Sequence, residues 1–245
     1  DLVVLYLRNP SYGKFFGYEN LDEYVDLMDC DLREQYLDVR RRQRHKKNSG
    51  CDVSENIVTE ILALLRRFQK RIVQFEKRGE TEITADIHDA LAGVLNSKYG
   101  INVSREFTMG RAKKKLGETD LYFSKEIDGI VEDYAVLENK YIENFTDQYF
   151  QLMGYMNQNF KFGITLSINR KMTLKAGLDR IEEKLKAIDK EQAFSPLSVN
   201  RVEFGADAVI VSQHIVPETE KTMKVYHLIF HLNDTERKEA ADVAR

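Results

Sequence analysis

One segment of the chain, AVLENKY at residues 135–141, changes abruptly from apolar to polar residues. Its first three residues suit a buried strand, and Glu138, Asn139 and Lys140 then place an acid, an amide and a base in succession. Burying such groups costs free energy unless they are paired or bind a metal. The segment therefore either leaves the core for water or carries chemistry.

Asp120 is the residue that offers this polar group a chemical role. The stretches ETDLYFS and DYAVLENKY are predicted to form the two arms of a hairpin across EIDGIVE, which places Asp120 beside the second arm. Alternate residues of a strand share a face, so Glu138 and Lys140 point one way and Asn139 points the other. We therefore expect Asp120, Glu138 and Lys140 to converge at one end of a sheet.

Two carboxylates beside a lysine suit metal-assisted hydrolysis of a phosphate ester. Mg²⁺ binds oxygen ligands, commonly one or two carboxylates together with a substrate phosphate, and Mn²⁺ shares this preference. The metal lowers the pKa of a bound water and shields the charge of the phosphate. Lys140, with a pKa set by the nearby carboxylates and the metal, is then the residue expected to orient or deprotonate that water.

The order of these residues resembles the core motif of the PD-(D/E)xK nuclease superfamily. Asp120 corresponds to the first acid of the motif, and residues 138–140 correspond to its (D/E)xK part. Thr119 stands where the family name has proline, a departure that removes no metal ligand.

A second element of the resemblance lies in the segment QLMGY. Gln151 and Tyr155 match the QxxxY element that RecB-type and lambda-exonuclease-type members carry on the helix after the motif strand. Their spacing of four places both on one helix face, from which the amide and the hydroxyl can support Lys140 or a phosphate. Gln148, one turn earlier, either assists Gln151 or faces solvent.

The resemblance covers residues 80–170 and implies both a fold and an activity. It implies a restriction-endonuclease-like α/β core, with Asp120 and Glu138 as metal ligands. Members also place an acid on the first helix of the core, and here Glu82 and Asp86 compete for that role. The implied activity is Mg²⁺-dependent hydrolysis of nucleic acid. The resemblance to this family is the only reason to expect DNA rather than RNA as the substrate.

The biological setting and the cutting mode stay open at this stage. Similar cores serve as effectors in bacterial restriction and anti-phage (antiviral) defence, and the same role is an expectation here. Endonuclease and exonuclease action are both open, as are DNA and RNA substrates. The alternative function is a catalytically inactive nuclease-fold module that binds nucleic acid or a partner protein.

A basic run precedes Asp120 and is the candidate nucleic-acid contact. An ordinary solvated loop is the alternative for such a run, but this one lies next to the proposed metal site and suits phosphate contacts. The candidate residues are Arg111, Lys113, Lys114 and Lys115.

Hydrophobic periodicity predicts the elements that must position these residues. We expect a helical N-terminal module over residues 1–78, a nuclease-like domain over 79–235 and a solvated tail over 236–245. Helices alternate with strands in the second part, which indicates an α/β fold with a mixed sheet flanked by helices. The expected helices span 55–79, 81–100, 144–160 and 174–189, and the expected strands span 101–109, the hairpin, 162–168, 199–216 and 223–232.

Composition limits the kinds of partner and cellular compartment that suit this chain. The formal net charge of the 245 residues is −3, so nucleic-acid contact must come from local basic patches. Two cysteines, Cys30 and Cys51, fit a reduced cytoplasmic protein better than a disulfide scaffold. No apolar run approaches the length of a membrane span, and we expect no membrane association. Because the chain begins with Asp1, we also expect a longer protein, and either a homo-oligomer or additional domains are compatible with the sequence.

Overall fold

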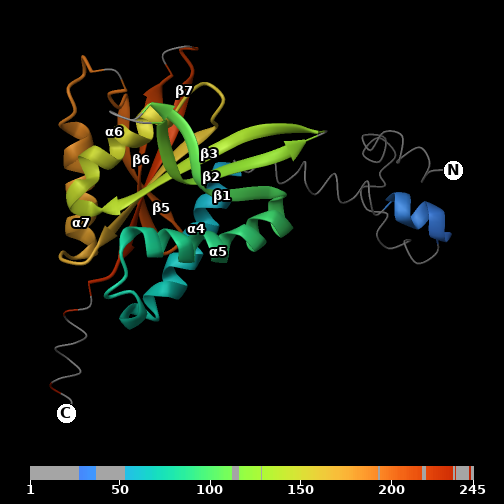
Figure 1. Ribbon diagram of the computed structural model, residues 1–245, viewed down its shortest axis with the longest axis horizontal. Helices are drawn as coiled ribbons and strands as arrows, with labels where there is room; N and C mark the ends of the chain where they lie inside the picture. Colours follow the sequence, from blue (N-terminus) through green and yellow to red (C-terminus); the bar gives the residue numbers. More distant parts are fainter. Residues whose placement is uncertain are drawn as a thin grey trace. The chain divides into compact units, whose positions relative to one another are not determined.

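In the computed structural model, contacts divide the chain into two units, residues 1–55 and 56–245. The second unit contains the sheet (Figure 1). The residues that the structure describes are 28–36, 53–111, 116–127, 129–192, 194–216, 219–233, 235 and 243. Within these residues, no helix combines the length and the apolar character that crossing a membrane requires.

A seven-stranded mixed sheet forms the centre of the second unit, in the order β1-β2-β3-β4-β7-β6-β5. The central strands β3, β4 and β7 run parallel to one another, and all other neighbours are antiparallel. The predicted α/β class with a mixed sheet is confirmed. The strands are β1 (Ile101–Arg111), β2 (Leu116–Ile127), β3 (Ile130–Tyr141), β4 (Phe162–Asn169), β5 (Ser198–Phe204), β6 (Asp207–Ile215) and β7 (Thr222–His231).

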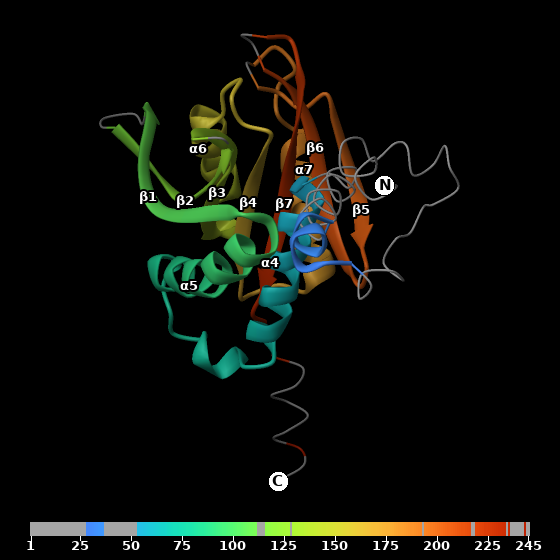
Figure 2. The same cartoon turned by 90° about the vertical axis from the view of Figure 1, so that its right-hand side faces the viewer.

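Four helices and two short 3-10 turns accompany the sheet. Two of the helices precede the sheet in the sequence, and the other two alternate with its strands (Figure 2). The elements are α4 (Val53–Gln69), η2 (Ile72–Gln74), α5 (Glu80–Tyr99), η3 (Ile142–Asn144), α6 (Phe145–Tyr155) and α7 (Leu174–Lys186).

The two pairs of helices cover opposite faces of the sheet. On β7, Phe230 packs against Phe68 of α4, with ring centroids 6.2 Å apart. The neighbouring Ile229 belongs to the core formed with α6 and α7. On β3, Val136 joins that same core, whereas the Asn139 side chain reaches Thr84 of α5. Because successive residues of a strand point to opposite faces, α6 and α7 lie on one face, and α4 and α5 lie on the other.

The first helix of the sheet-bearing unit is shorter than its sequence pattern predicts. Instead of continuing to Gly79, α4 ends at Gln69, and the chain turns through η2. Phe75 folds back onto Phe68, with stacked rings 4.6 Å apart, and it also contacts Phe230 of the sheet. The aromatic contacts of the turn therefore replace the last predicted helical turns.

The compact unit that contains the sheet begins earlier than the predicted domain boundary at residue 79. Residues 56–78 belong to the same unit as the strands. Arg66 pairs with Asp207 of β6 at 3.1 Å, and the Gln69 amide donates to the His231 carbonyl of β7 at 3.3 Å. Of the predicted tail, all but Val243 lies outside the described residues.

A fully buried polar network links β4, β6 and β7 beneath α6. Ser212 contacts both His214 and His227, at 2.7 and 2.8 Å, and His227 also contacts Thr165 at 2.8 Å. Tyr149 of α6 lies 3.3 Å from His214. Burial lowers the pKa of His214 to about 4 and lowers the pKa of His227 strongly, so both rings stay neutral. The network therefore serves packing, because each of these groups has a partner.

Candidate active site

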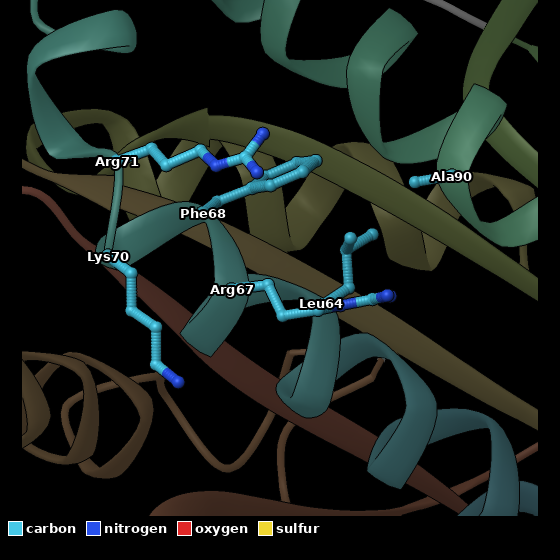
Figure 3. A pocket seen from close by; sticks show the side chains of 6 residues that line it. All are labelled: Leu64, Arg67, Phe68, Lys70, Arg71 and Ala90. Carbon is cyan, nitrogen blue, oxygen red and sulfur yellow. The ribbon is translucent and has the colours of Figure 1, made fainter.

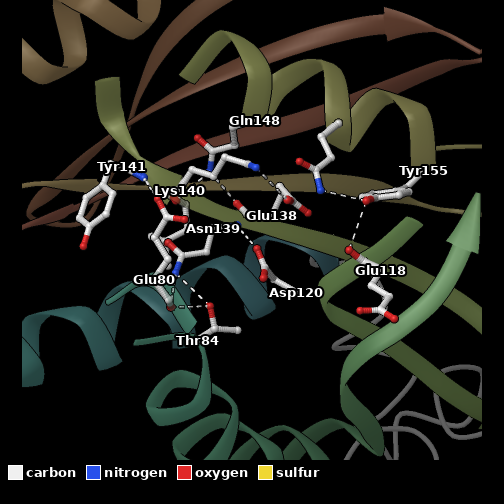
Figure 4. Close-up of polar contacts among 12 residues, drawn as sticks. Glu80, Thr84, Glu118, Asp120, Glu138, Asn139, Lys140, Tyr141, Gln148 and Tyr155 are labelled. Atoms are coloured by element: carbon white, nitrogen blue, oxygen red, sulfur yellow. Dashed lines mark hydrogen bonds and ion pairs between the residues drawn. The ribbon is translucent and has the colours of Figure 1, made fainter. Parts of the chain in front are cut away.

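The structure brings Asp120, Glu138 and Lys140 together at the ends of β2 and β3 (Figure 4). Leu121 pairs with Leu137 across the hairpin, and Asp120 and Glu138 are the next residues outward on the two strands. The backbone N–H of Asn139 donates a hydrogen bond to Asp120 Oδ2 at 2.6 Å, and Lys140 Nζ lies 4.0 Å from Glu138 Oε1. Two carboxylates and one ammonium therefore share one end of the sheet.

Asn139 points to the opposite face, as the alternation of the strand predicts. Its side-chain amide donates to Thr84 Oγ1 at 3.0 Å and to the Glu80 carbonyl at 3.2 Å (Figure 4). These bonds fasten β3 to the first turn of α5. The Asn139 side chain thus has a structural role. Because neighbouring residues of a strand point to opposite faces, Glu138 and Lys140 lie on the sheet face that α6 covers.

Glu80 is a third acid at this site, and the sequence analysis did not select it. Glu80 is the first residue of α5, and its Oε1 accepts a 2.7 Å hydrogen bond from the Tyr141 amide at the end of β3. Its charge raises the pKa of both Asp120 and Glu138. The signal in the sequence was an acid directly after Gly79, where a helix begins.

The structure places Glu82 and Asp86, the two acids expected from the first helix, in other interactions. The Glu82 carboxylate accepts a hydrogen bond from the Gly79 amide at 2.8 Å and caps the start of α5. Asp86 forms an ion pair with Arg78. Helix capping and ion pairing thus occupy both side chains, and Glu80 is the acid of α5 that approaches Asp120 and Glu138.

Burial controls the charge of the two central carboxylates. It raises the pKa of Asp120 to about 6, against the opposing effects of the Asn139 amide and Lys140. Burial, followed by the charge of Asp120, raises the pKa of Glu138 further. Two carboxylates without enough positive charge between them favour their protonated forms. A divalent cation beside them would reverse this preference.

Glu138 also has an unsatisfied oxygen. The residue is only 3% exposed, and within the described part of the chain its Oε2 has no hydrogen-bond partner. Buried polar atoms are normally paired, so such an atom indicates a missing ligand or a strained position. A hard cation bound by Glu138 and Asp120 would pair with this oxygen. Among the described residues, no group of three or more Asp, Glu, His or Cys side chains is arranged to hold a metal, so substrate or water oxygens would complete the shell.

Gln151 and Tyr155 form one hydrogen-bonded unit on α6. The Gln151 amide donates to the Tyr155 hydroxyl at 3.0 Å, and that hydroxyl donates to the Glu118 carbonyl at 3.2 Å (Figure 4). Burial raises the pKa of Tyr155, and the charges of Glu138 and Asp120 act in the same direction. The pair therefore holds β2 two residues before Asp120.

Replacing Tyr155 with phenylalanine should have a modest effect. The ring keeps its packing, but the hydrogen bond to the Glu118 carbonyl is lost, and we expect a stability loss of about 1 kcal/mol. Thermal unfolding measures this change. Tyr134→Phe removes a hydroxyl for which the described residues show no hydrogen bond, and it serves as the control. Equal unfolding temperatures for the two variants would contradict the bracing role of Tyr155.

Gln148 is buried between α6 and the sheet and does not face solvent. Its Nε2 donates to the Glu138 carbonyl at 2.7 Å and to the Leu166 carbonyl at 2.8 Å, while the Ser167 hydroxyl donates to its Oε1 at 2.9 Å. The side chain is 0% exposed. Gln148 therefore fixes the backbone of Glu138 directly, a role that differs from both alternatives from the sequence, assistance to Gln151 and exposure to solvent.

The basic run predicted to contact nucleic acid lies largely outside the described part of the chain. Lys113, Lys114 and Lys115 are among the residues that the structure does not describe, and for Arg111 only the backbone is described, at the end of β1. Phosphate binding by these four residues stays a prediction.

Comparisons with known proteins leave the site to be interpreted from its own geometry. No family model matches the chain, and neither the curated proteins nor the solved structures contain a significant match to it.

Proposed function

We propose that this protein is a Mg²⁺-dependent hydrolase of phosphodiester bonds in nucleic acid, with DNA as the expected substrate, and that it belongs with the PD-(D/E)xK nucleases. The observation that carries the proposal is Glu138. It is almost fully buried and lies near Asp120 and Lys140, and one of its oxygens has no hydrogen-bond partner among the residues that the structure describes. Burying a carboxylate with an unpaired oxygen costs free energy, and a bound cation or substrate would offset that cost.

The residues divide the work according to their positions. Asp120 and Glu138 would hold the metal, and Glu80 supplies a further carboxylate fixed by the Tyr141 amide. When bound, Mg²⁺ would lower the pKa of a water and offset the charge of the phosphate. Lys140, 4.0 Å from Glu138 and a quarter exposed, is placed to orient the attacking water. Gln148 bonds the backbones of β3 and β4, and the pair of Gln151 with Tyr155 bonds the backbone of β2.

Cleavage assays test the proposal directly. We expect Lys140→Ala to lower the rate of Mg²⁺-dependent cleavage by roughly 10² to 10⁴-fold, the range for loss of a positioned acid–base group. Lys161→Ala removes an exposed lysine that lies 3.8 Å from Glu132, and it should leave the rate unchanged. Substrates should include closed-circular and linear DNA and the corresponding RNA, because cutting a closed circle requires endonuclease action.

Two results would overturn the proposal. Full activity in Lys140→Ala or Asp120→Ala would show that these residues do not catalyse the reaction. Calorimetry with no Mg²⁺ or Mn²⁺ binding, together with no cleavage of any substrate, would favour a module that only binds nucleic acid or a partner protein.

A further inference from the structure

A pocket of about 430 Å³ lies between the C-terminal part of α4 and the middle of α5 (Figure 3). Its volume is within the range of about 300 to 1,000 Å³ that is typical of small-molecule sites. Three of its lining side chains are cationic and three are apolar. They are Arg67, Lys70, Arg71, Leu64, Phe68 and Ala90.

The three cations of the pocket lack counterions. Within the described residues, Arg67, Lys70 and Arg71 form no ion pair, and all three are exposed. Their neighbours differ, since Arg66 pairs with Asp207 at 3.1 Å and Lys98 pairs with Glu60 at 2.7 Å. The pocket therefore concentrates positive charge that the described residues leave unneutralised.

The helix end explains only part of this charge. Cations are favoured in the last turn of a helix because of its dipole, and Arg67 satisfies that preference. Lys70 and Arg71 follow the end of α4, so the dipole does not account for their gathering around the same pocket. A bound anion is the simplest partner for all three.

An aromatic wall adds a second kind of recognition. Phe68 is held by Phe75, with stacked rings 4.6 Å apart, and by Phe230 on β7. Phe68 also lines the pocket, beside Leu64 and Ala90. A fixed aromatic ring next to several cations suits a nucleotide, because the base packs on the ring while the phosphate meets the cations.

The pocket is separate from the candidate active site. Asp120, Glu138 and Lys140 lie on the face of the sheet that α6 covers, whereas α4 and α5 cover the opposite face. Along α5, Glu80 and Ala90 are ten residues apart, which corresponds to about 15 Å. A ligand of the pocket would therefore bind beyond the carboxylates, with α5 as a rigid connection between the two sites.

We propose that this pocket is a second, non-catalytic binding site for a phosphorylated nucleoside. The cations hold the phosphate, and Phe68 and Leu64 contact the base or sugar. The unit is either a free nucleotide or one nucleotide of a bound strand, and both present the same chemistry. The proposal does not depend on nuclease activity, because it uses none of the residues of the candidate active site.

Binding measurements on the full chain, in EDTA, test the pocket without catalysis. The probes are thymidine monophosphate, a short labelled oligothymidylate and inorganic phosphate. We expect Arg67→Ala/Arg71→Ala to weaken binding of a nucleotide probe at least about tenfold, because two charged hydrogen-bond donors to the phosphate are removed. Lys184→Ala/Lys190→Ala removes the same number of exposed cations elsewhere and should leave the affinity unchanged.

The probes and variants distinguish a free nucleotide from a bound strand, and specific binding from a general attraction between charges. Binding of the monophosphate supports a free-nucleotide site, and binding of the oligonucleotide alone supports a strand contact. Equal weakening by the control variant would overturn the proposal, because it would show general attraction between charges. Inorganic phosphate binding as tightly as the nucleotides, or loss of nucleotide binding in Glu138→Gln, would also overturn it. Phe68→Leu should weaken the nucleotides but not inorganic phosphate.

Discussion

Glu138→Gln is expected to stabilise the metal-free protein while it abolishes Mg²⁺-dependent cleavage. Glu138 is 3% exposed, and no described residue forms a hydrogen bond with its Oε2, so an ionised carboxylate is unfavourable there without a cation. A neutral amide of the same shape removes that penalty. We expect a gain on the order of 2 kcal/mol at pH 8, equivalent to about 5 °C in unfolding temperature.

The pH dependence of this gain follows from the raised pKa of Glu138. Below about pH 4, the ordinary range for a glutamate, the group is protonated in both the folded and the unfolded state and has no effect. As the pH rises, the unfolded glutamate ionises while the folded one retains its proton, so the wild type loses stability. The advantage of the variant should therefore be absent near pH 4 and grow toward pH 8. Asp120, with its pKa raised to about 6, lowers the stability of both proteins between about pH 4 and 6.

Mg²⁺ should reverse the order of the two proteins. The metal requires ionised ligands, so its binding recovers the stability that Glu138 and Asp120 remove and strengthens as the pH rises. Thermal unfolding with EDTA or Mg²⁺, at several pH values, measures both effects. Glu132→Gln changes a more exposed carboxylate on the same strand and should not alter the response to Mg²⁺. A variant at Glu138 that is less stable than the wild type in EDTA at pH 8, or that keeps the full Mg²⁺ response, would contradict this account.

The hairpin that carries Asp120 and Glu138 was predictable because it depends on local sequence. Apolar runs at residues 121–123 and 135–137 mark the two strands, and a tight connection joins them, with Gly129 at a φ of 78° that favours glycine. The hairpin also contains a β-bulge between Phe123 and Ser124, which shifts the pairing by one residue and brings Asp120 opposite Glu138. The hairpin was predictable from the sequence, but this bulge was not. The orientation of Asn139 follows from the alternation of side chains along a strand.

Glu80 was not predictable in the same way, because its role depends on how α5 docks against β3. Its contact with Tyr141 joins residues 61 positions apart. Periodicity shows which face of α5 is apolar, but it does not show which turn meets the strand end. The position of the helix start also determines which acid is available, because the Glu82 carboxylate accepts a hydrogen bond from the Gly79 backbone N–H and caps the helix. A small error in a helix boundary therefore changes which acid is assigned to the site.

The premature end of α4 has a similar physical origin. The apolar stripe of the sequence continues to Phe75, and it is compatible with a single long helix. Phe75 instead reaches both Phe68 and Phe230, a contact that only the folded sheet provides. Tertiary packing thus overrides local helical preference, and the segment that follows α4 carries Lys70 and Arg71, which line the pocket.

Replacing Gln148 with leucine should damage both stability and metal binding. Leucine fills a similar volume but offers no partner to the carbonyls of Glu138 and Leu166 or to the Ser167 hydroxyl. Each buried group left unpaired costs about 1 to 3 kcal/mol, and partial relaxation should limit the total loss to about 2 to 4 kcal/mol. The unfolding temperature should fall by about 5 to 10 °C.

Metal affinity distinguishes a positioning role of Gln148 from simple destabilisation. Because Gln148 holds the backbone of Glu138, its loss should weaken Mg²⁺ binding by roughly 10 to 100-fold, the range for groups that support metal ligands. Calorimetry well below the unfolding temperature measures this on folded protein. Thr146→Leu alters an exposed residue of the same helix and should leave the Mg²⁺ affinity within about threefold of the wild type, less than the loss of a supporting group costs. If Gln148→Leu lowers the unfolding temperature but leaves Mg²⁺ affinity unchanged, Gln148 supports the sheet alone, and the carboxylate of Glu138 is positioned by its own strand.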